Sequence, residues 1–258
     1  MQEKPLGVPP MGGVSMSMLG EALRRGWRDM RYAPGYAVFF AGVYVLIGLV
    51  MVWVTWVTGQ SYWLIFAAVG FPLVGPFAAV GLYEISHRLE QGEALVRSEI
   101  FGVIVHQGRR QLPSICAVIV IMFLFWFFLA HMIFALFLGF SEMKNVSTSF
   151  DIYLTPEGLS MLAFGSAVGG VFALLLYMLT VVSLPLLLDR EVDFVTAMIT
   201  SFKVVTGNAK PMLVWAVFIA VVTFAAMVPA FLGLFVVLPL LGHATWHLYR
   251  QIVEAGHG

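Results

Sequence analysis

Residues 32–83 read YAPGYAVFFAGVYVLIGLVMVWVTWVTGQSYWLIFAAVGFPLVGPFAAVGLY, which is 52 residues without a single Asp, Glu, Lys or Arg. A helix needs about 20 apolar residues to cross a bilayer, so this run is too long for one span. The polar, turn-forming cluster Thr58-Gly59-Gln60-Ser61 divides it. We therefore predict two transmembrane helices here, at about residues 34–57 and 62–84.

Three further uncharged runs continue this pattern, over residues 111–141, 158–188 and 211–249. The first two lack a turn signal at their middle and predict one span each, at about 112–139 and 159–188. As one helix the third would be about 58 Å long, nearly twice a hydrocarbon core of about 30 Å. It therefore predicts two short spans, at about 211–228 and 230–249, with a tight turn near residues 227–230. The predicted fold is an all-α integral membrane protein, with a six-transmembrane-helix bundle over residues 32–250.

The basic residues test this threading independently, because cytoplasmic loops carry an excess of Lys and Arg. With six spans, 13 of the 14 basic residues fall on one side of the membrane. Only Lys144 falls on the other side, in a loop that Glu142, Asp151 and Glu157 make acidic. We therefore predict a multi-pass membrane protein with both termini in the cytoplasm. Residues 1–31 are predicted to be a flexible cytoplasmic segment and residues 251–258 a cytoplasmic tail.

The composition excludes several classes of protein. Hydrophobic residues make up 60% of the chain and charged residues 11%, against about 25% charged in a typical soluble domain, which excludes a large aqueous domain. Cys116 is the single cysteine, so one chain can build neither a disulfide framework nor a multi-cysteine metal site. No basic stripe interleaved with aromatic residues is present; membrane lipid is an expected partner and nucleic acid is not.

Each predicted helix that runs back to the cytoplasm contains a proline, at Pro72, Pro185 and Pro239. Proline leaves a backbone carbonyl without its usual partner and bends a helix. We expect a bend at each position, which serves either as a gating hinge or as an adjustment of helix packing.

Two cytoplasmic loops contain apolar residues at helical spacing with polar residues beside them. The pattern predicts two amphipathic helices, which lie on the inner leaflet, dock on the cytoplasmic ends of the bundle, or do both. The apolar positions are Leu89, Val96, Ile100 and Val103 in the second loop and Val192, Val195, Met198, Ile199, Phe202 and Val205 in the fourth.

Three histidines are candidate cofactor ligands. His243 and His247 are four residues apart and share a helix face, so they could bind a metal or haem; interfacial anchoring beside Trp246 is the alternative. His131 lies inside a predicted span, where an ionisable residue is expected to face the bundle interior with a partner. A neutral imidazole bonded to a backbone carbonyl is the simpler interpretation of His131. No cofactor is identified by these residues alone.

Two similar charged clusters follow proline-containing helices at equivalent inner ends. As exposed ion pairs they would each contribute about 0–1 kcal/mol, which suggests a role in orientation. Their members are Glu84, His87, Arg88 and Glu90 in one cluster, and Asp189, Arg190, Glu191 and Asp193 in the other. The chain has no nucleophile elbow and no phosphate loop, and we expect no helix to carry Glu-x-x-His on an inward face. No catalytic residue is therefore assigned, and we expect no enzymatic activity.

Three stretches carry a resemblance to a known family: 75–90, with Gly75-Pro76-Phe77 and Gly81-Leu82-Tyr83-Glu84; 188–193; and 242–250, Gly-His-Ala-Thr-Trp-His-Leu-Tyr-Arg. Together they resemble an uncharacterised family of proteobacterial integral membrane proteins, defined as a domain of unknown function, over roughly residues 25–250. The resemblance implies an inner-membrane location and a six-helix fold, and no activity. Members sometimes carry the label cytochrome c oxidase subunit I, which this chain does not fit, since it has half the expected helices and too few membrane histidines.

Three functions are compatible with these observations. The first is a non-enzymatic accessory, assembly or scaffold component that contacts other inner-membrane proteins, further copies of itself or lipid. The second is a respiratory-chain-associated protein that binds haem or copper through His243, His247 or His131. The third is a small-molecule transporter that uses the proline-bent helices.

Overall fold

The structure is a computed structural model that describes residues 4–59, 63–139 and 151–258; the side chains of 63–74 and 151–152 lie outside this description, as does Lys144. The described residues are helical, and their one β-bridge is isolated, between Leu6 and Glu191. The elements are α1 (Met16–Tyr32), α2 (Pro34–Thr58), α3 (Trp63–Gln91), α4 (Arg97–Gln107), α5 (Leu112–Leu138), the 3-10 helix η1 (Asp151–Leu154), α6 (Pro156–Thr180), α7 (Ser183–Asp189), α8 (Phe194–Gly207), α9 (Ala209–Met227) and α10 (Leu234–His257). The predicted all-α class is confirmed.

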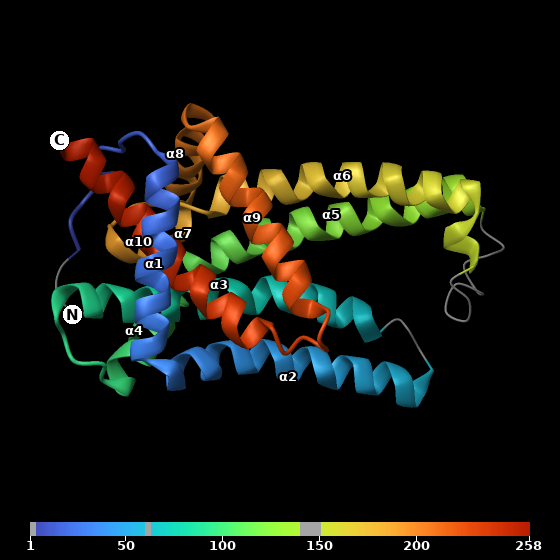
Figure 1. Ribbon diagram of the computed structural model, residues 1–258, viewed down its shortest axis with the longest axis horizontal. Coiled ribbons are helices and arrows are strands. Elements are labelled where there is room, and N and C mark those ends of the chain that lie inside the picture. The colour runs from blue at the N-terminus through green and yellow to red at the C-terminus, as the bar shows by residue number, and fades with distance from the viewer. Residues whose placement is uncertain (1–3, 60–62, 140–150) are drawn as a thin grey trace.

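The helices divide the molecule into two regions (Figure 1). The long helices α2, α3, α5 and α6 run along the longest axis. At one end of them lie α1, α4, α7, α8 and the second half of α10, together with both chain termini. We call this end the head. It contains most of the buried polar residues and a core centred on Trp215, Trp246 and Tyr249.

Four stretches of the described chain are long and apolar enough to cross a membrane: Pro34–Thr58, Leu112–Leu138, Pro156–Asp189 and Ala209–Met227. They match four of the predicted spans, and the integral membrane class is confirmed. The other two predicted spans, 62–84 and 230–249, overlap α3 and α10 for most of their length, and their crossing stays a prediction. The second half of α10 carries buried polar side chains, including Thr245 and Gln251, which lower its hydropathy.

The turn from α9 to α10 covers residues 228–233, close to the predicted position. It packs against the middle of α2, because Val45 forms one small core cluster with Ala226 and Leu234. The turn satisfies much of its own backbone: Val228, Ala230, Phe231 and Leu232 each donate a hydrogen bond to a carbonyl of residues 225–229. The side chain of Val228 is exposed beside this apolar packing.

The sequence analysis expected a bend at each of three prolines, and the structure shows an interruption next to one of them, Pro185. The helix that was predicted over residues 159–188 breaks at Val181 and Val182, one turn before Pro185. Proline removes the donor to the carbonyl one turn earlier, which accounts for the position of the break. Ser201 of α8 accepts from the freed Val182 N–H at 3.1 Å. Pro239 lies inside the continuous helix α10, and Pro72 lies within α3, where its side chain is outside the description.

Residues 16–32 form α1, whereas the sequence analysis expected a flexible segment. The helix forms because Ala22 and Gly26 give it a small-residue face that packs closely on α10. A Cβ atom at Gly26 would lie 2.7 Å from the backbone nitrogen of Ala244. The predicted C-terminal tail differs in the same way, since α10 continues to His257.

The residues before α1 form an extended segment, residues 4–15, that we call the N-terminal strap. Glu191 donates to the Pro5 carbonyl at 3.0 Å, and Gly7 donates to the Glu191 carbonyl at 3.2 Å. Further along, Gly12 donates to the Ile252 carbonyl at 2.9 Å, and Val14 donates to Oδ1 of Asn208 at 2.8 Å. The strap therefore ties the loop after α7, the end of α10 and the start of α9 together.

Replacing Gly12 with valine is expected to release the strap, because a Cβ atom there would lie 2.4 Å from the backbone of Ala255. Overpacking of this kind costs about 1–3 kcal/mol, so local opening should rise roughly tenfold or more. Hydrogen exchange of residues 4–15, followed by mass spectrometry, measures it. Gly13→Val is the matched control, since its nearest neighbour would be Asn208 Oδ1 at 3.8 Å. Equal exchange in both variants would contradict the close packing at Gly12.

The two loops predicted to contain amphipathic helices contain α4 and α8, and the location of these helices on the inner leaflet stays a prediction. In α8 the predicted apolar positions divide between two faces. Met198 and Val205 are buried in the head, while Val195, Ile199 and Phe202 are exposed. The helix thus docks on the bundle and also presents an apolar surface outward. In α4, Ile100 is fully buried.

Candidate functional site

A buried ionisable pair joins α1 to α10 in the head. His247 Nε2 lies 2.6 Å from Asp29 Oδ2, and both side chains are 2% exposed. Burial raises the pKa of the Asp29 carboxyl, but the hydrogen bond and the charge of His247 lower it by more, so that it lies below the usual 3.8. Asp29 is buried because it follows Ala22 and Gly26 on the packed face of α1.

A second buried pair lies one helical turn away on α10. His243 Nδ1 is 2.8 Å from Ser86 Oγ of α3, and both residues are fully buried. Ser86 also lowers the pKa of Asp29 through a hydrogen bond. We call Asp29, Ser86, His243 and His247 the polar core. It joins α1, α3 and α10 by buried hydrogen bonds, and a buried network of this kind is costly to leave half satisfied.

The charged clusters predicted from the sequence meet around α10. Arg250 of α10 pairs with Glu90 at 3.2 Å and approaches Asp189 at 3.9 Å. Tyr249 donates to Asp189 at 2.7 Å, and Trp246 donates to Glu90 at 3.2 Å. The two clusters were predicted to pair across the bundle. In the structure they are linked indirectly, because side chains of α10 contact Glu90 of one cluster and Asp189 of the other.

Within each cluster the charges also pair locally. Arg88 pairs with Glu84 at 2.7 Å and with Glu99 of α4. Arg190 pairs with Asp189 at 3.1 Å. The remaining members are placed as follows: Glu191 pairs with Arg110, Asp193 caps α8, and His87 contacts Gln91 at 3.1 Å with its ring edge against Trp246. The clusters thus hold α3, α4, α7 and α10 in the head.

His131 lies apart from the other two histidines. It is exposed on α5, where its Nδ1 donates to the Phe127 carbonyl at 2.8 Å. The expectation that it faces the bundle interior is wrong, because α5 turns this side chain outward. The simpler interpretation, an imidazole bonded to a backbone carbonyl, describes the observed contact. The structure brings His243 and His247 together with Asp29 and Ser86, which sequence reasoning did not select.

The polar core has the beginnings of a ligand set. Within the described part of the chain, His243 Nε2 and His247 Nδ1 are buried without a hydrogen-bond partner, while the other ring nitrogens are engaged. A carboxylate that holds one nitrogen of an imidazole is the usual support for a metal-binding histidine. The same described residues contain no group of three or more His, Cys, Asp or Glu arranged for a metal ion.

Comparison with protein families adds one finding. A family model described as a predicted integral membrane protein matches residues 63–189. The family is DUF2189, and this stretch is similar to it. The family resemblance expected from the sequence is confirmed, over a shorter range than residues 25–250. No curated protein and no solved structure matches the chain. The matched stretch extends from α3 to α7, so it contains Ser86, whereas Asp29, His243 and His247 lie outside it.

Proposed function

We propose that this protein is a non-enzymatic component of the bacterial inner membrane, an accessory, assembly or scaffold subunit that acts by contacting other membrane proteins or lipid. The observation that carries this proposal is the exposure of its apolar helices. In the most apolar stretches of the four candidate spans, 28, 22, 44 and 17% of the residues are buried. Most residues of these four stretches are therefore at least partly exposed, which leaves surface for a partner.

The exposed surface includes residue types that dominate interfaces. Trp56 near the end of α2 and Leu136 near the end of α5 are each 81% exposed, and Phe224 of α9 is 71% exposed. Aromatic side chains are enriched in membrane and protein contacts. The charged side chains of the head, in contrast, largely pair with one another. The exposed apolar helices can contact partners, and the charged side chains of the head are occupied with one another. Both observations support a scaffold function.

The orientation we propose places the head, and with it both termini, in the cytoplasm, with α2, α3, α5, α6, α9 and α10 as the six membrane helices. The supporting observation is the asymmetry of charge, since six crossings place 13 of the 14 basic residues on the cytoplasmic side. The exposed apolar face of α8, with Lys203 beside it, suits the inner leaflet.

Photo-crosslinking in native membranes tests the proposed function. A photoreactive residue at position 56 or 136 is expected to give defined crosslinks to other membrane proteins or to a second copy, identified by mass spectrometry. The same residue at position 254, exposed on the head, serves as the control. A protein that gives no crosslink from either helix position and runs as an isolated monomer in mild detergent would refute the proposal, as would turnover of a substrate by the purified chain.

A second candidate is a respiratory-chain-associated protein that binds haem or copper. It is favoured by the two unpartnered buried nitrogens of His243 and His247. An absorption spectrum and a metal determination on protein purified from native membranes test it. A Soret band or stoichiometric copper that disappears in His243→Ala and His247→Ala, but persists in His131→Ala, would support this candidate. A colourless, metal-free protein that still forms its crosslinks would exclude the haem- or copper-binding candidate.

A further inference from the structure

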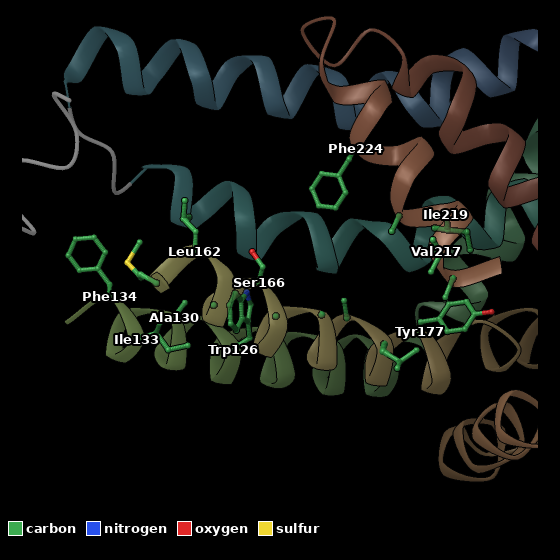
Figure 2. A pocket seen from close by; sticks show the side chains of 18 of the residues that line it. Trp126, Ala130, Ile133, Phe134, Leu162, Ser166, Tyr177, Val217, Ile219 and Phe224 are labelled. Carbon is green, nitrogen blue, oxygen red and sulfur yellow. The ribbon is translucent and has the colours of Figure 1, made fainter. Parts of the chain in front are cut away.

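An apolar groove of about 1000 Å³ runs between α5 and α6 on one side and α9 on the other. Figure 2 shows Phe224 of α9 on one wall and Trp126 and Ser166 on the other. We call it the α6–α9 groove. Ligand pockets typically measure about 300–1,000 Å³, so this one is large.

The chemistry of the groove suits hydrocarbon. Its walls are mainly aliphatic and aromatic side chains and glycines. The hydroxyl of Tyr177, at one end, already donates to the Met212 carbonyl at 2.8 Å, which leaves it less available to a polar ligand. A ligand that lies along these walls needs a long apolar portion with few hydrogen-bonding groups.

The glycines of α6 serve two different purposes. A Cβ atom at Gly169 would lie 3.0 Å from the Trp126 ring, and one at Gly165 would lie 3.9 Å from Ile133. Gly169 therefore serves the close packing of α5 on α6, whereas 3.9 Å at Gly165 is an ordinary contact distance. Gly170 differs, since a Cβ atom there would meet nothing within 4 Å. Ser166 and Gly170 are exposed on the wall of the groove, so a large side chain at position 170 would enter it.

The groove is long enough to hold an acyl chain. On α9 the lining residues extend from Leu213 to Phe224, about 16 Å along the helix, and on α6 they extend from Met161 to Tyr177, about 24 Å. The hydrocarbon core of a bilayer is about 30 Å thick, so even the shorter wall covers about half of it, which is the depth that one acyl chain occupies.

A positive charge stands at the head end of the same helix face. Lys210, Leu213, Val217 and Phe224 follow one another at helical spacing, so Lys210 continues the groove wall by one turn toward the head. Lys210 is exposed, as is Lys203 at the end of α8. Neither forms an ion pair with any residue that the structure describes. A phosphate at this level would meet an ammonium group that has no competing carboxylate.

We propose that the α6–α9 groove binds an anionic phospholipid, with one acyl chain along α6 and its phosphate at Lys210. The proposal rests on the membrane function proposed above and names the lipid contact that belongs to it. Lys203 adds positive charge beside the headgroup. The bound lipid fills the space that separates α9 from α5 and α6.

The test uses full-length protein that is washed free of lipid in detergent and then mixed with phosphatidylglycerol or phosphatidylcholine. Native mass spectrometry counts the lipid retained per chain. We expect one phosphatidylglycerol per chain, retained about tenfold more tightly than phosphatidylcholine. Gly170→Phe should fill the groove and lower retention of both lipids at least tenfold, and Lys210→Glu should remove the preference between them.

Val171→Phe is the matched control, because this neighbouring residue is exposed and outside the groove lining. It should retain lipid as the unmodified protein does. If Gly170→Phe fails to fold, Ala220→Phe tests the opposite wall. Equal retention in the groove and control variants, or crosslinks from position 217 to a second copy, would overturn the proposal. Positions 56 and 136 lie outside the groove. If crosslinks from these positions persist while lipid retention does not depend on the groove, the scaffold function stands and the lipid site does not.

Discussion

Replacing Gly26 with leucine is expected to separate α1 from α10 and to destabilise the head strongly. Even the first side-chain atom would lie 2.7 Å from the backbone nitrogen of Ala244 and 3.0 Å from its Cα. A backbone cannot yield as a flexible side chain does, so the helices must move apart. Overpacking costs about 1–3 kcal/mol, and loss of the Asp29–His247 contact adds to it, so we expect at least about 3 kcal/mol.

Thermal unfolding in detergent measures this effect. For a chain of this size, about 3 kcal/mol corresponds to a fall in Tm of roughly 6–12 °C. Gly20→Leu is the matched control on the same helix, because a Cβ atom there would meet nothing within 4 Å. It should leave Tm unchanged or raise it slightly, since leucine is the better helix former. Similar Tm values for the two variants would show that α1 is not packed on α10 as described.

The second large effect is expected from Asp29→Ala. Removing one partner of a buried ionisable pair typically costs about 3–5 kcal/mol, because the other group stays buried without compensation. His247→Ala should cost a similar amount, and the double variant should cost less than the sum of the two. This coupling is measured by a double-mutant cycle on unfolding free energies. Additive single losses would mean that the 2.6 Å contact between His247 and Asp29 does not stabilise the fold.

The same pair predicts how stability depends on pH. The pKa of Asp29 is lower in the folded protein than its usual 3.8, so the unfolded state binds its proton first as the pH falls. The stabilisation is therefore fully present above the unfolded pKa and is lost as the pH falls through the folded value. Unfolding measured between about pH 6 and pH 3 should show a steeper loss in the unmodified protein than in Asp29→Asn, which has no carboxyl to titrate. Parallel curves would contradict the assignment.

The membrane class and four of the spans could be predicted from sequence, because a long uncharged run is stable in a bilayer only as a helix that crosses it. The break before Pro185 follows from the same local chemistry. The head could not be predicted in this way. Arg24, Arg25, Arg28 and Arg31 make residues 16–32 read as a charged lead-in, yet these side chains point outward while Ala22 and Gly26 pack on α10. Tertiary packing, which local composition does not report, orders this helix.

The candidate site shows a similar division. His243 and His247 stood out because their spacing puts them on one face of one helix. Asp29 contacts His247 across 218 positions of sequence, and Ser86 contacts His243 across 157, so no local pattern links them. The helical spacing of Ala22, Gly26 and Asp29, which places them on one face of α1, was the available signal that Asp29 is buried. The direction in which the His131 side chain points could not be predicted either, because α5 is apolar on all its faces.

The packing of the α9–α10 turn against Val45 affects how the membrane crossings of this chain are counted. A hairpin that ended at the middle of a neighbouring helix would enter and leave the membrane through the same surface, unlike the two crossings proposed for α9 and α10. It would leave the number of remaining crossings even, and every flanking arginine and lysine would stay where two full crossings put it. The asymmetry of charge therefore does not distinguish the two arrangements, but a thiol at residue 228 does. With the two crossings proposed, this thiol should react with membrane-impermeant reagents from the side opposite the head; poor reaction from either side would indicate a hairpin that does not cross.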